Sequence, residues 1–355
     1  MKLLRNAFHG KSVLITGDTG FKGSWLALCL LELGAHVHGY ALAPEHSEGH
    51  FRLLHLDDLI NHCDGDIRDV IAMQNFFDKT QPEILFHLAA QPLVGQSYLD
   101  PKTTFDTNIG GSVNVLECVR GSPSLRAAIY ITSDKCYVNN EWVWGYRESD
   151  KLGGHDPYSA SKAAAELILS AYVDSFFCKN STLGIASVRA GNVIGGGDWA
   201  GGRIVPDCIR ALRNKQPIII RSPQSTRPWQ HVLEPLSGYL KLAAMLLSDP
   251  SKFGGAWNFG PNSKAVRTVY DVASSLVGNW GEGKILVDAN PNVFHEARLL
   301  HLNCDRANFE LGWAARWDFK RTMAETATWY REVANGANPR EVSRRQIDQY
   351  FGFQS

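Results

Sequence analysis

The chain has 355 residues, 44% of them hydrophobic, which is enough to bury a large core. Lys+Arg and Asp+Glu both number 36, so no net basic field favours nucleic acid or an anionic membrane. The seven cysteines never fall in a CxxC pair, which argues against a zinc site or a disulfide framework, and we expect no bound metal. The N-terminus has no apolar core of signal-peptide length before the first expected strand, and no apolar stretch is long enough to span a membrane, so we expect a soluble, cytoplasmic protein.

Short apolar runs alternate with helical stretches through the first half of the chain. We expect buried strands in the most continuously apolar runs, at 12–16, 37–40, 84–88, 127–132 and 185–188. The stretches between them that are long enough for helices are 23–33, 70–79, 105–119 and 157–177. This alternation predicts an α/β fold with a Rossmann-type, doubly wound parallel sheet and helices on both faces.

The character of the sequence changes after about residue 190. Glycines cluster there, and tryptophans recur in loop-like settings. Strand-like runs at 218–220 and 257–259 are interleaved with a helical stretch at 236–247. We therefore expect two lobes, 1–190 and a smaller one over 191–355, that form a ligand cleft, with some segments of the second lobe crossing back.

A glycine-rich loop, Gly17-Asp18-Thr19-Gly20-Phe21-Lys22-Gly23, follows the first expected strand, and a helix begins near Ser24. Its three glycines suit a tight turn, close backbone approach to a pyrophosphate, and close packing of helix on strand. An ordinary glycine turn has similar letters, but the order of strand, loop and helix favours dinucleotide binding by lobe 1–190. The loop residues expected to contact the cofactor are Gly17, Thr19, Gly20, Phe21, Lys22 and Gly23.

The second expected strand ends in His38-Gly39-Tyr40-Ala41-Leu42, with neither the acid common in NAD sites nor the Arg common in NADP sites. The lack of a nearby Arg favours NAD, and the missing acid predicts modest affinity. Asp66 and Ile67 are candidates for the adenine edge. The other expected cofactor contacts are Tyr40, Asn108 and the strand-end residues Leu88, Ala89 and Ala90.

A second motif, Asp156-Pro157-Tyr158-Ser159-Ala160-Ser161-Lys162, opens an alanine-rich helix. Tyr158 and Lys162 are four residues apart and share a helix face. A free tyrosine has a pKa of about 10, and a neighbouring ammonium favours the phenolate, so Tyr158 could act as a base. An incidental Tyr with a solvated Lys would fit YxxxK equally well. The upstream glycine loop and the strand-end hydroxyl of Ser133 favour the catalytic interpretation.

TGxxGFKG, HLAA, a strand-end serine and YxxxK together resemble the extended short-chain dehydrogenases/reductases, the group that holds nucleotide-sugar epimerases and dehydratases. The resemblance implies that Ser133 hydrogen-bonds the sugar, Tyr158 is the base and Lys162 grips the nicotinamide ribose of NAD. It also implies a homodimer or homotetramer built on the helices at 105–119 and 157–177. Asp18 stands where we expect His in relatives, a departure that could alter cofactor affinity.

An acid and a cation, Asp134 and Lys135, directly follow Ser133. A 4,6-dehydration oxidises the C4 alcohol, removes the C5 proton, protonates the departing C6 hydroxyl and returns the hydride to C6. It therefore needs two proton-handling groups beside the tyrosine. We expect Asp134 to be the acid, kept protonated by its pocket. Dehydratases acting on dTDP-glucose have Glu at the next position, so Lys135 leaves the C5 base open, and a structural Asp–Lys pair is the alternative.

Longer motifs, TSDKCY, EWVWGYRE, AGNVIGGGDW and RPWQHVLEP, resemble those of CDP-glucose 4,6-dehydratases, over almost the whole chain. The resemblance implies conversion of CDP-D-glucose to CDP-4-dehydro-6-deoxy-D-glucose. It implies Arg203 and Arg227 on the substrate diphosphate and Asn192 near it. Arg298 is a third candidate cation, and Gln91 is a weaker candidate for the sugar. Cytosine recognition cannot be derived from the residues themselves.

Two other functions remain as alternatives. A nucleotide-sugar 4-epimerase would use the same Ser133, Tyr158, Lys162 and cofactor, but it needs no acid at C6, so Asp134 and Lys135 argue against it. A catalytically inactive, cofactor-sensing protein would have no need to keep Tyr158 and Lys162 on one helix face beside Ser133.

Overall fold

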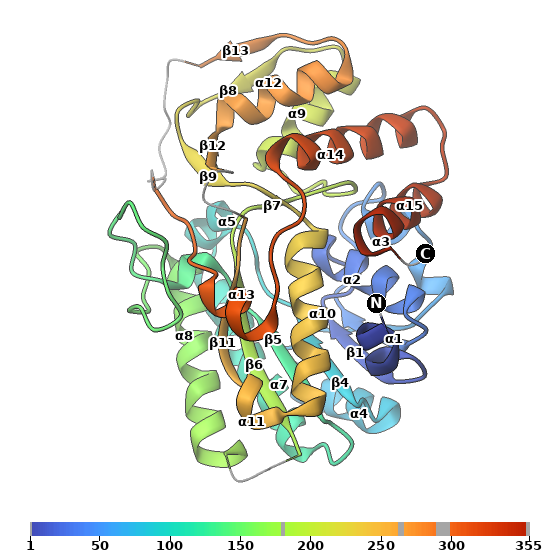
Figure 1. Cartoon of the computed structure of the whole chain (residues 1–355), viewed down its shortest axis with the longest axis vertical. Helices are drawn as coiled ribbons and strands as arrows, with labels where there is room; N and C mark the ends of the chain where they lie inside the picture. Colours follow the sequence, from blue (N-terminus) through green and yellow to red (C-terminus); the bar gives the residue numbers. More distant parts are fainter. Residues whose placement is uncertain (1, 179–181, 262–265, 289–298, 353–355) are drawn as a thin grey trace.

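The computed structural model describes residues 2–178, 182–261, 266–288 and 299–352 (Figure 1). Its centre is a seven-stranded sheet in which all neighbouring strands are parallel. The strands are β1 (Ser12–Thr16), β2 (His36–Ala41), β3 (Asn61–Asp64), β4 (Ile84–His87), β5 (Ala127–Ile131), β6 (Gly184–Ala190) and β11 (Gly255–Phe259). Their order, β11-β6-β5-β4-β1-β2-β3, reverses beside β1, which confirms the predicted Rossmann-type fold.

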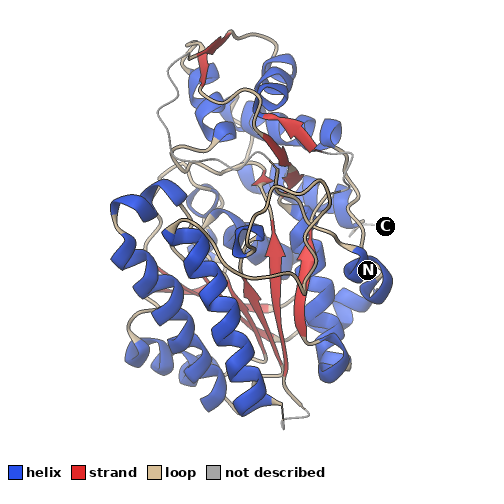
Figure 2. Ribbon diagram, turned by 90° about the vertical axis from the view of Figure 1, so that its left-hand side faces the viewer, coloured by secondary structure: helices blue, strands red, loops and turns tan. Residues whose placement is uncertain are grey.

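Helices cover both faces of this sheet. Figure 2 shows helices on both sides of the strands. They are α2 (Phe21–Glu32) and α10 (Leu233–Ser248) on one face, and α4 (Val70–Thr80), α7 (Gly111–Gly121) and α8 (Pro157–Tyr172) on the other. Successive strand residues point to opposite faces, so Val13 and Ile15 of β1 join the first core while Leu14 joins the second. Burial on both sides explains why the central strands are continuously apolar.

The second half adds three two-stranded sheets and most of the remaining helices. The pairs are β7 (Val193–Ile194) with β10 (Gln230–His231), β8 (Ile218–Ile220) with β13 (Ile285–Val287), and β9 (Thr226–Pro228) with β12 (Val266–Thr268). Its other helices are α9 (Ile204–Arg213), α11 (Pro250–Phe253), α12 (Val269–Trp280), α13 (Asp305–Leu311), α14 (Phe319–Ala334) and α15 (Pro339–Phe351). Four short helices complete the first half: α1 (Lys2–Phe8), α3 (His50–Leu53), α5 (Val94–Leu99) and α6 (Pro101–Phe105).

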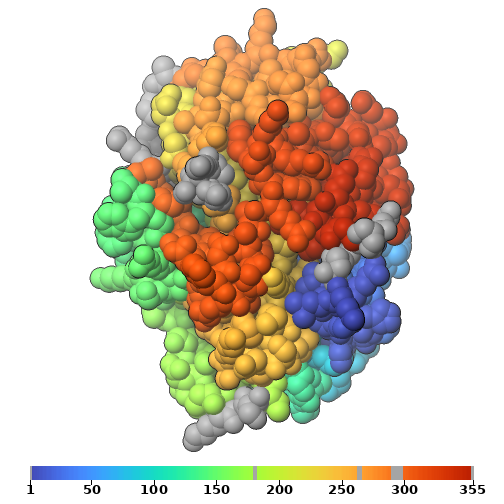
Figure 3. Space-filling view, in the orientation of Figure 1, coloured from blue at the N-terminus to red at the C-terminus, as the bar shows by residue number. Residues whose placement is uncertain are grey.

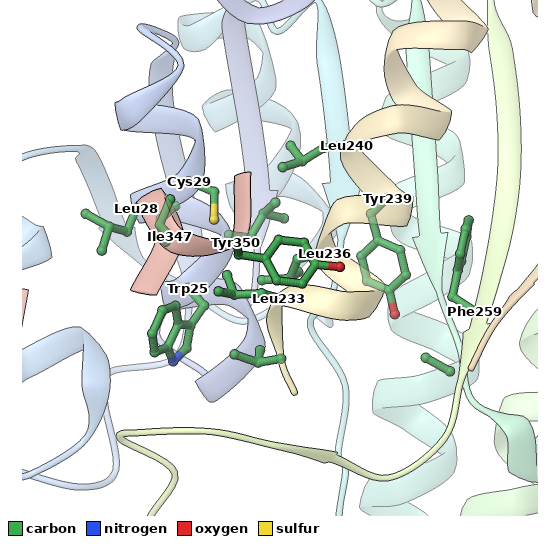
Figure 4. Packing of buried hydrophobic residues seen from close by; sticks show 14 of the residues in the cluster. Trp25, Leu28, Cys29, Leu233, Leu236, Tyr239, Leu240, Phe259, Ile347 and Tyr350 are labelled. Carbon is green, nitrogen blue, oxygen red and sulfur yellow. The ribbon is translucent and has the colours of Figure 1, made fainter. Parts of the chain in front are cut away.

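Several segments of the second half lie against the first. β11 is an edge strand of the large sheet, beside β6. Leu302 forms an isolated bridge with Tyr146, and the orange-red segment around α13 borders the green part of the surface in Figure 3. Trp25 of α2, Leu233 of α10 and Tyr350 of α15 lie together in one apolar cluster (Figure 4). In the described ranges, no helix combines the length and apolar character needed to cross a bilayer.

Two of the predicted helices contain π-helical turns. The stretch 105–119 divides into the end of α6, a π-turn over Asp106–Gly110, and α7. The stretch 157–177 consists of α8 followed by a π-turn over Val173–Phe177. π-turns frequently mark functional sites, and the first one carries Asn108, an expected cofactor contact.

Candidate active site

The expected site residues gather at the carboxyl ends of the central strands. Between β1 and β4 the strand order reverses, and in such sheets the crevice at the reversal is where ligands bind. The glycine loop follows β1, the Leu88–Ala90 segment follows β4, and a 3₁₀ turn over Asp134–Cys136 follows β5. These three loops come together at the crevice.

The glycine loop has the geometry that a pyrophosphate needs. Gly17 has a φ of 80°, and a Cβ there would lie 2.7 Å from the amide nitrogen of Ala89. A Cβ on Gly23 would lie 2.1 Å from the carbonyl oxygen of Gly17, so neither position tolerates a side chain. α2 begins after Gly20 with no side-chain cap, which leaves its first N–H groups available to an anion. The loop therefore fits a dinucleotide.

Tyr158, Ser133 and Lys162 come together at the start of α8, where they are 8%, 7% and 7% exposed. The helix begins here because Asp156 caps it, accepting a hydrogen bond from the Ser159 amide at 2.9 Å. Ser133 lies within hydrogen-bonding reach of the Tyr158 phenol. The structure thus places the expected hydroxyl, phenol and ammonium groups close together, where β5 ends and α8 begins.

Burial controls the charge of these groups. It raises the pKa of Tyr158 to about 12, and the hydrogen bond with Ser133 offsets only part of that rise. Burial and the charge of Lys22 lower the pKa of Lys162 to about 8. Without ligand, Tyr158 is therefore neutral near pH 7, and its use as a base depends on positive charge brought close to it.

Asp134 carries the second proton-handling group. It is 3% exposed; its Oδ1 accepts a hydrogen bond from the Ser133 hydroxyl at 3.1 Å, and its Oδ2 has no partner among the described residues. Oδ2 lies against Gly191, where a Cβ would come within 2.7 Å of it. Burial raises the pKa of Asp134, although Lys135, Ser133 and Arg227 oppose the rise. The carboxyl group is thus biased toward the protonated form that a general acid requires.

Lys22, in the glycine loop, lies close enough to Asp134 and Lys162 for their charges to interact. The sequence did not predict this proximity. Burial lowers the pKa of Lys22 to about 8, the charge of Arg203 adds to the effect, and Asp134 opposes it. Among the described residues, none is hydrogen-bonded to its ammonium group. The only sequence signal was a cation inside the glycine-rich loop, four residues after its one acid, Asp18.

A buried ion pair between Glu166 and Arg189 lies next to these residues. The carboxylate of Glu166, four residues after Lys162 on α8, accepts four hydrogen bonds. Their donors are Thr132 Oγ1, Ser187 Oγ (2.7 Å), Arg189 Nε (3.0 Å) and Arg189 Nη2 (2.7 Å). Arg189 also donates to the Tyr137 hydroxyl at 2.7 Å. This network ties α8 to β5, β6 and the turn that carries Asp134.

Asn108 and Gln91 use their side chains locally. Asn108 Oδ1 accepts from the Gln91 amide nitrogen at 2.8 Å, and its Nδ2 donates to Ser161 Oγ at 2.9 Å. Gln91 Nε2 donates to Thr104 Oγ1 at 2.9 Å, and its Oε1 accepts from the Leu93 amide at 2.6 Å. This geometry favours a positioning role for both residues over the direct ligand contacts that we expected.

At the far end of the crevice, beside β2 and β3, polar side chains are paired with one another. Asp66 is bonded to the Arg68 guanidinium, with Nε–Oδ2 at 2.9 Å. Tyr40 is 1% exposed and donates to the Asp66 carbonyl at 3.3 Å. This hydrogen bond holds the segment that we expect at the adenine edge. Thr19 donates to the carbonyl of Leu42 at 2.9 Å. The apolar residues expected at the cofactor are wholly or partly buried; they are Phe21, Ile67, Leu88, Ala89 and Ala90.

Two arginines approach the crevice from the second half. Arg203 precedes α9 and pairs with Asp198 at 2.9 Å, and its charge lowers the pKa of Tyr158 against the stronger effect of burial. Arg227 of β9 is 7% exposed, and its charge acts on Asp134 in the same way. Both arginines that we expect to bind the diphosphate therefore lie close enough to Tyr158 and Asp134 for their charges to act on them.

The remaining substrate-side candidates differ in their placement. Asn192 follows β6, and its carbonyl accepts from the Gln230 amide at 3.2 Å. Arg298 lies outside the described residues. Two tryptophans of the long motifs are also buried. Trp229, 4% exposed, belongs to the core and donates to the Arg267 carbonyl at 3.1 Å. Trp199 is 8% exposed, and no described residue accepts from its indole N–H.

Known proteins resemble this chain in both sequence and fold. The profile of the GDP-mannose 4,6 dehydratase family matches residues 14–326. A CDP-glucose 4,6-dehydratase of Salmonella typhimurium is 47% identical over 351 residues, 98% of each chain. The epimerase Mth375 of Methanothermobacter thermautotrophicus (TM-score 0.80, 22% identity, 97% of each chain) is a similar solved structure. So is dTDP-glucose 4,6-dehydratase of Bacillus anthracis in complex with NAD (TM-score 0.75, 19% identity, 92% of this chain and 99% of that one).

Proposed function

The chain belongs to the GDP-mannose 4,6 dehydratase family, and within it we propose that the protein converts CDP-D-glucose to CDP-4-dehydro-6-deoxy-D-glucose with NAD as the cofactor. The observation that carries the proposal is the buried Asp134 carboxyl with an unpartnered oxygen, next to Ser133 and Tyr158. An oxidation at C4 alone would not need that acid. The CDP assignment is supported by the Salmonella typhimurium relative at 47% identity.

In this reaction each residue of the site has one proposed role. Tyr158 takes the proton of the C4 hydroxyl, assisted by Ser133, and the ammonium of Lys162 stabilises the phenolate. The new C4 ketone acidifies the C5 hydrogen, which Lys135 removes. Asp134 gives its proton to the C6 hydroxyl, which leaves as water. The glycine loop and Lys162 would hold NAD, which would supply the redox chemistry that moves a hydride from C4 to C6, and the C5 base returns a proton to C5.

Lys22 offers a second candidate for the C5 base. Its pKa of about 8 suits proton removal near neutral pH, and its charge acts on Asp134. The two lysines are separated by exchange of the C5 hydrogen with deuterated water. The variant that loses exchange at C5 while still oxidising C4 identifies the base. If Lys135→Met and Lys22→Met both keep full exchange, neither lysine is the base.

The proposed reaction is tested by incubating the protein with NAD and, in turn, CDP-glucose, dTDP-glucose and GDP-mannose in deuterated water, followed by NMR. We expect a 6-deoxy-4-keto product with deuterium at C5 from CDP-glucose alone. The same product from another nucleotide would keep the chemistry and contradict the CDP assignment. Inversion at C4 without loss of water would indicate an epimerase. The epimerase Mth375 has a similar fold to this chain.

A homodimer is supported by the outer face of the first lobe. Apolar side chains are exposed along α5 to α8 and the π-turn after α8: Tyr98 (42%), Leu99 (78%), Phe105 (36%), Leu167 (59%) and Phe176 (55%). A patch of this kind on neighbouring helices is typical of an association surface. Sedimentation showing only a 39.3 kDa species would contradict the dimer.

All seven cysteines are free, which agrees with a reducing cytoplasm.

A further inference from the structure

The adenosine end of the cofactor site lacks the acid that usually selects NAD. β2 ends in Tyr40-Ala41 and is followed by Leu42, so no carboxylate projects from the strand end itself. A carboxylate is nevertheless present nearby. Asp18, the second residue of the glycine loop, is completely buried, and one of its oxygens, Oδ1, has no partner among the described residues.

Asp18 extends over β2. A Cβ added to Gly39 would lie 2.1 Å from Asp18 Oδ2 and 2.8 Å from Oδ1. The absence of a side chain at Gly39 therefore creates the space that this carboxylate fills. The acid that β2 does not provide is thus supplied from the neighbouring loop, above the same strand.

His62 of β3 holds this carboxylate in place. In the strand register His62 lies opposite Gly39, and its Nδ1 is 2.7 Å from Asp18 Oδ2. Its other nitrogen, Nε2, is 3.1 Å from Asp64 Oδ1. Burial disfavours a charge on His62, but the two carboxylates outweigh it and raise its pKa. Burial raises the pKa of Asp18, and the hydrogen bond and the charge of His62 oppose that rise. When all three groups are ionised, the trio Asp18–His62–Asp64 carries one net negative charge.

His62 and Asp64 are the charged side chains that act on Asp18, and the Arg68 guanidinium is bonded through Nε and Nη2 to Asp66 instead. A negative trio with an unused acceptor oxygen suits a ribose hydroxyl and repels a phosphate on the same ribose. We propose that Asp18, clamped by His62 and backed by Asp64, is the residue that makes the site select NAD over NADP. The inference rests on the proposed function, in that the site must bind a nicotinamide dinucleotide.

The test is the ratio of the dissociation constants for NADP⁺ and NAD⁺, measured by calorimetry without sugar substrate. We expect wild type to favour NAD⁺, and Asp18→Asn, which keeps the volume of the buried side chain, to lower the ratio at least tenfold. Asp64→Asn, at an exposed position, should lower it about two- to threefold. Asp78→Asn, on the exposed surface of α4, is the matched control and should leave it unchanged.

The outcomes separate the two proposals. If wild type binds neither dinucleotide, the proposed function fails. If wild type binds NAD⁺ and both Asp18→Asn and Asp64→Asn leave the ratio unchanged, the assignment of Asp18 is overturned. Asp18→Asn could unfold the protein, which a thermal melt would detect. The decision then falls to Asp64→Asn, whose side chain is 65% exposed: a lowered ratio supports the assignment and an unchanged ratio rejects it.

Discussion

The two ends of the crevice treat charge in opposite ways. Beside β2 and β3, Asp66 is bonded to Arg68 and Asp18 Oδ2 to His62, so each carboxylate already has an ionic partner and only Asp18 Oδ1 is left without one among the described residues. At the start of α8, the ammonium groups of Lys162 and Lys22 have no hydrogen-bonding partner among the described residues, although both are desolvated. The paired end is built to hold and discriminate, whereas the unpaired end keeps its charges available for substrate and for proton transfer.

The largest expected effect comes from removing the base at the unpaired end. Tyr158→Phe should lower the rate of C4 oxidation by about 10³- to 10⁴-fold, because the hydroxyl proton then has no acceptor. Single-turnover reduction of the cofactor measures this step. The matched control is Tyr172→Phe on the same helix, whose hydroxyl donates to Glu117 at 2.8 Å outside the pocket. Equal rates in both variants would contradict the role of Tyr158.

The next prediction concerns stability. Removing Arg189 breaks the buried ion pair with Glu166 and should lower the free energy of unfolding. Arg189→Met leaves the Glu166 carboxylate buried without its cation and should cost about 3–5 kcal/mol in the free energy of unfolding. Urea denaturation measures it. The double variant Arg189→Met, Glu166→Gln should recover part of the loss, since no buried charge is then left alone. Arg126→Met, at the exposed start of β5, is the control.

Asp134→Asn should slow the loss of water by about 10²- to 10³-fold without a matching effect on C4 oxidation, since the amide cannot protonate the leaving hydroxyl. Reduced nicotinamide should therefore accumulate, and its absorbance reports the result. Full turnover in this variant would remove Asp134 from the mechanism.

The smallest effect concerns pH. The pKa of Lys162 in the folded protein is about 8, below its ordinary 10.5, so the unfolded chain binds more protons between these values. Lys162→Met should therefore be stabilising relative to wild type below pH 8, and the advantage should shrink as the pH rises toward about 10.5. Urea unfolding at several pH values checks this, with Lys79→Met on the surface of α4 as control. An advantage independent of pH would show that the Lys162 charge is not the cause.

Local chemistry was enough to predict much of the fold and part of the site. β1 lies at the predicted residues 12–16 because its apolar run is bounded by Lys11 and Gly17. The motif around Tyr158 and Lys162 forms the predicted helix start, where cap and spacing are both local. β3, in contrast, reads Asn-His-Cys-Asp and has no apolar pattern, so its bounds were not predicted.

Contacts between distant segments could not be predicted from one sequence. The Asp18–His62 pair joins residues 44 positions apart through the register of β2 and β3. The placement of Lys22 beside Asp134 depends on how two loops meet above the sheet. Gln91 stays a weaker candidate for the sugar; its side-chain amide is hydrogen-bonded to Thr104 and Leu93, a local arrangement that no spacing rule reveals.

The position of β11 at the edge of the sheet has a consequence for synthesis of the chain. β6 is made about 70 residues before the strand that covers it, which at roughly 5–20 residues per second is a delay of roughly 4 to 14 s. During that time the apolar strand Gly184–Ala190 presents an open edge of unpaired backbone N–H and C=O groups to the ribosome's surroundings. A chain cut after residue 190 would keep that edge open permanently. We therefore expect the isolated first lobe to aggregate, and nascent chains to need a chaperone over this interval.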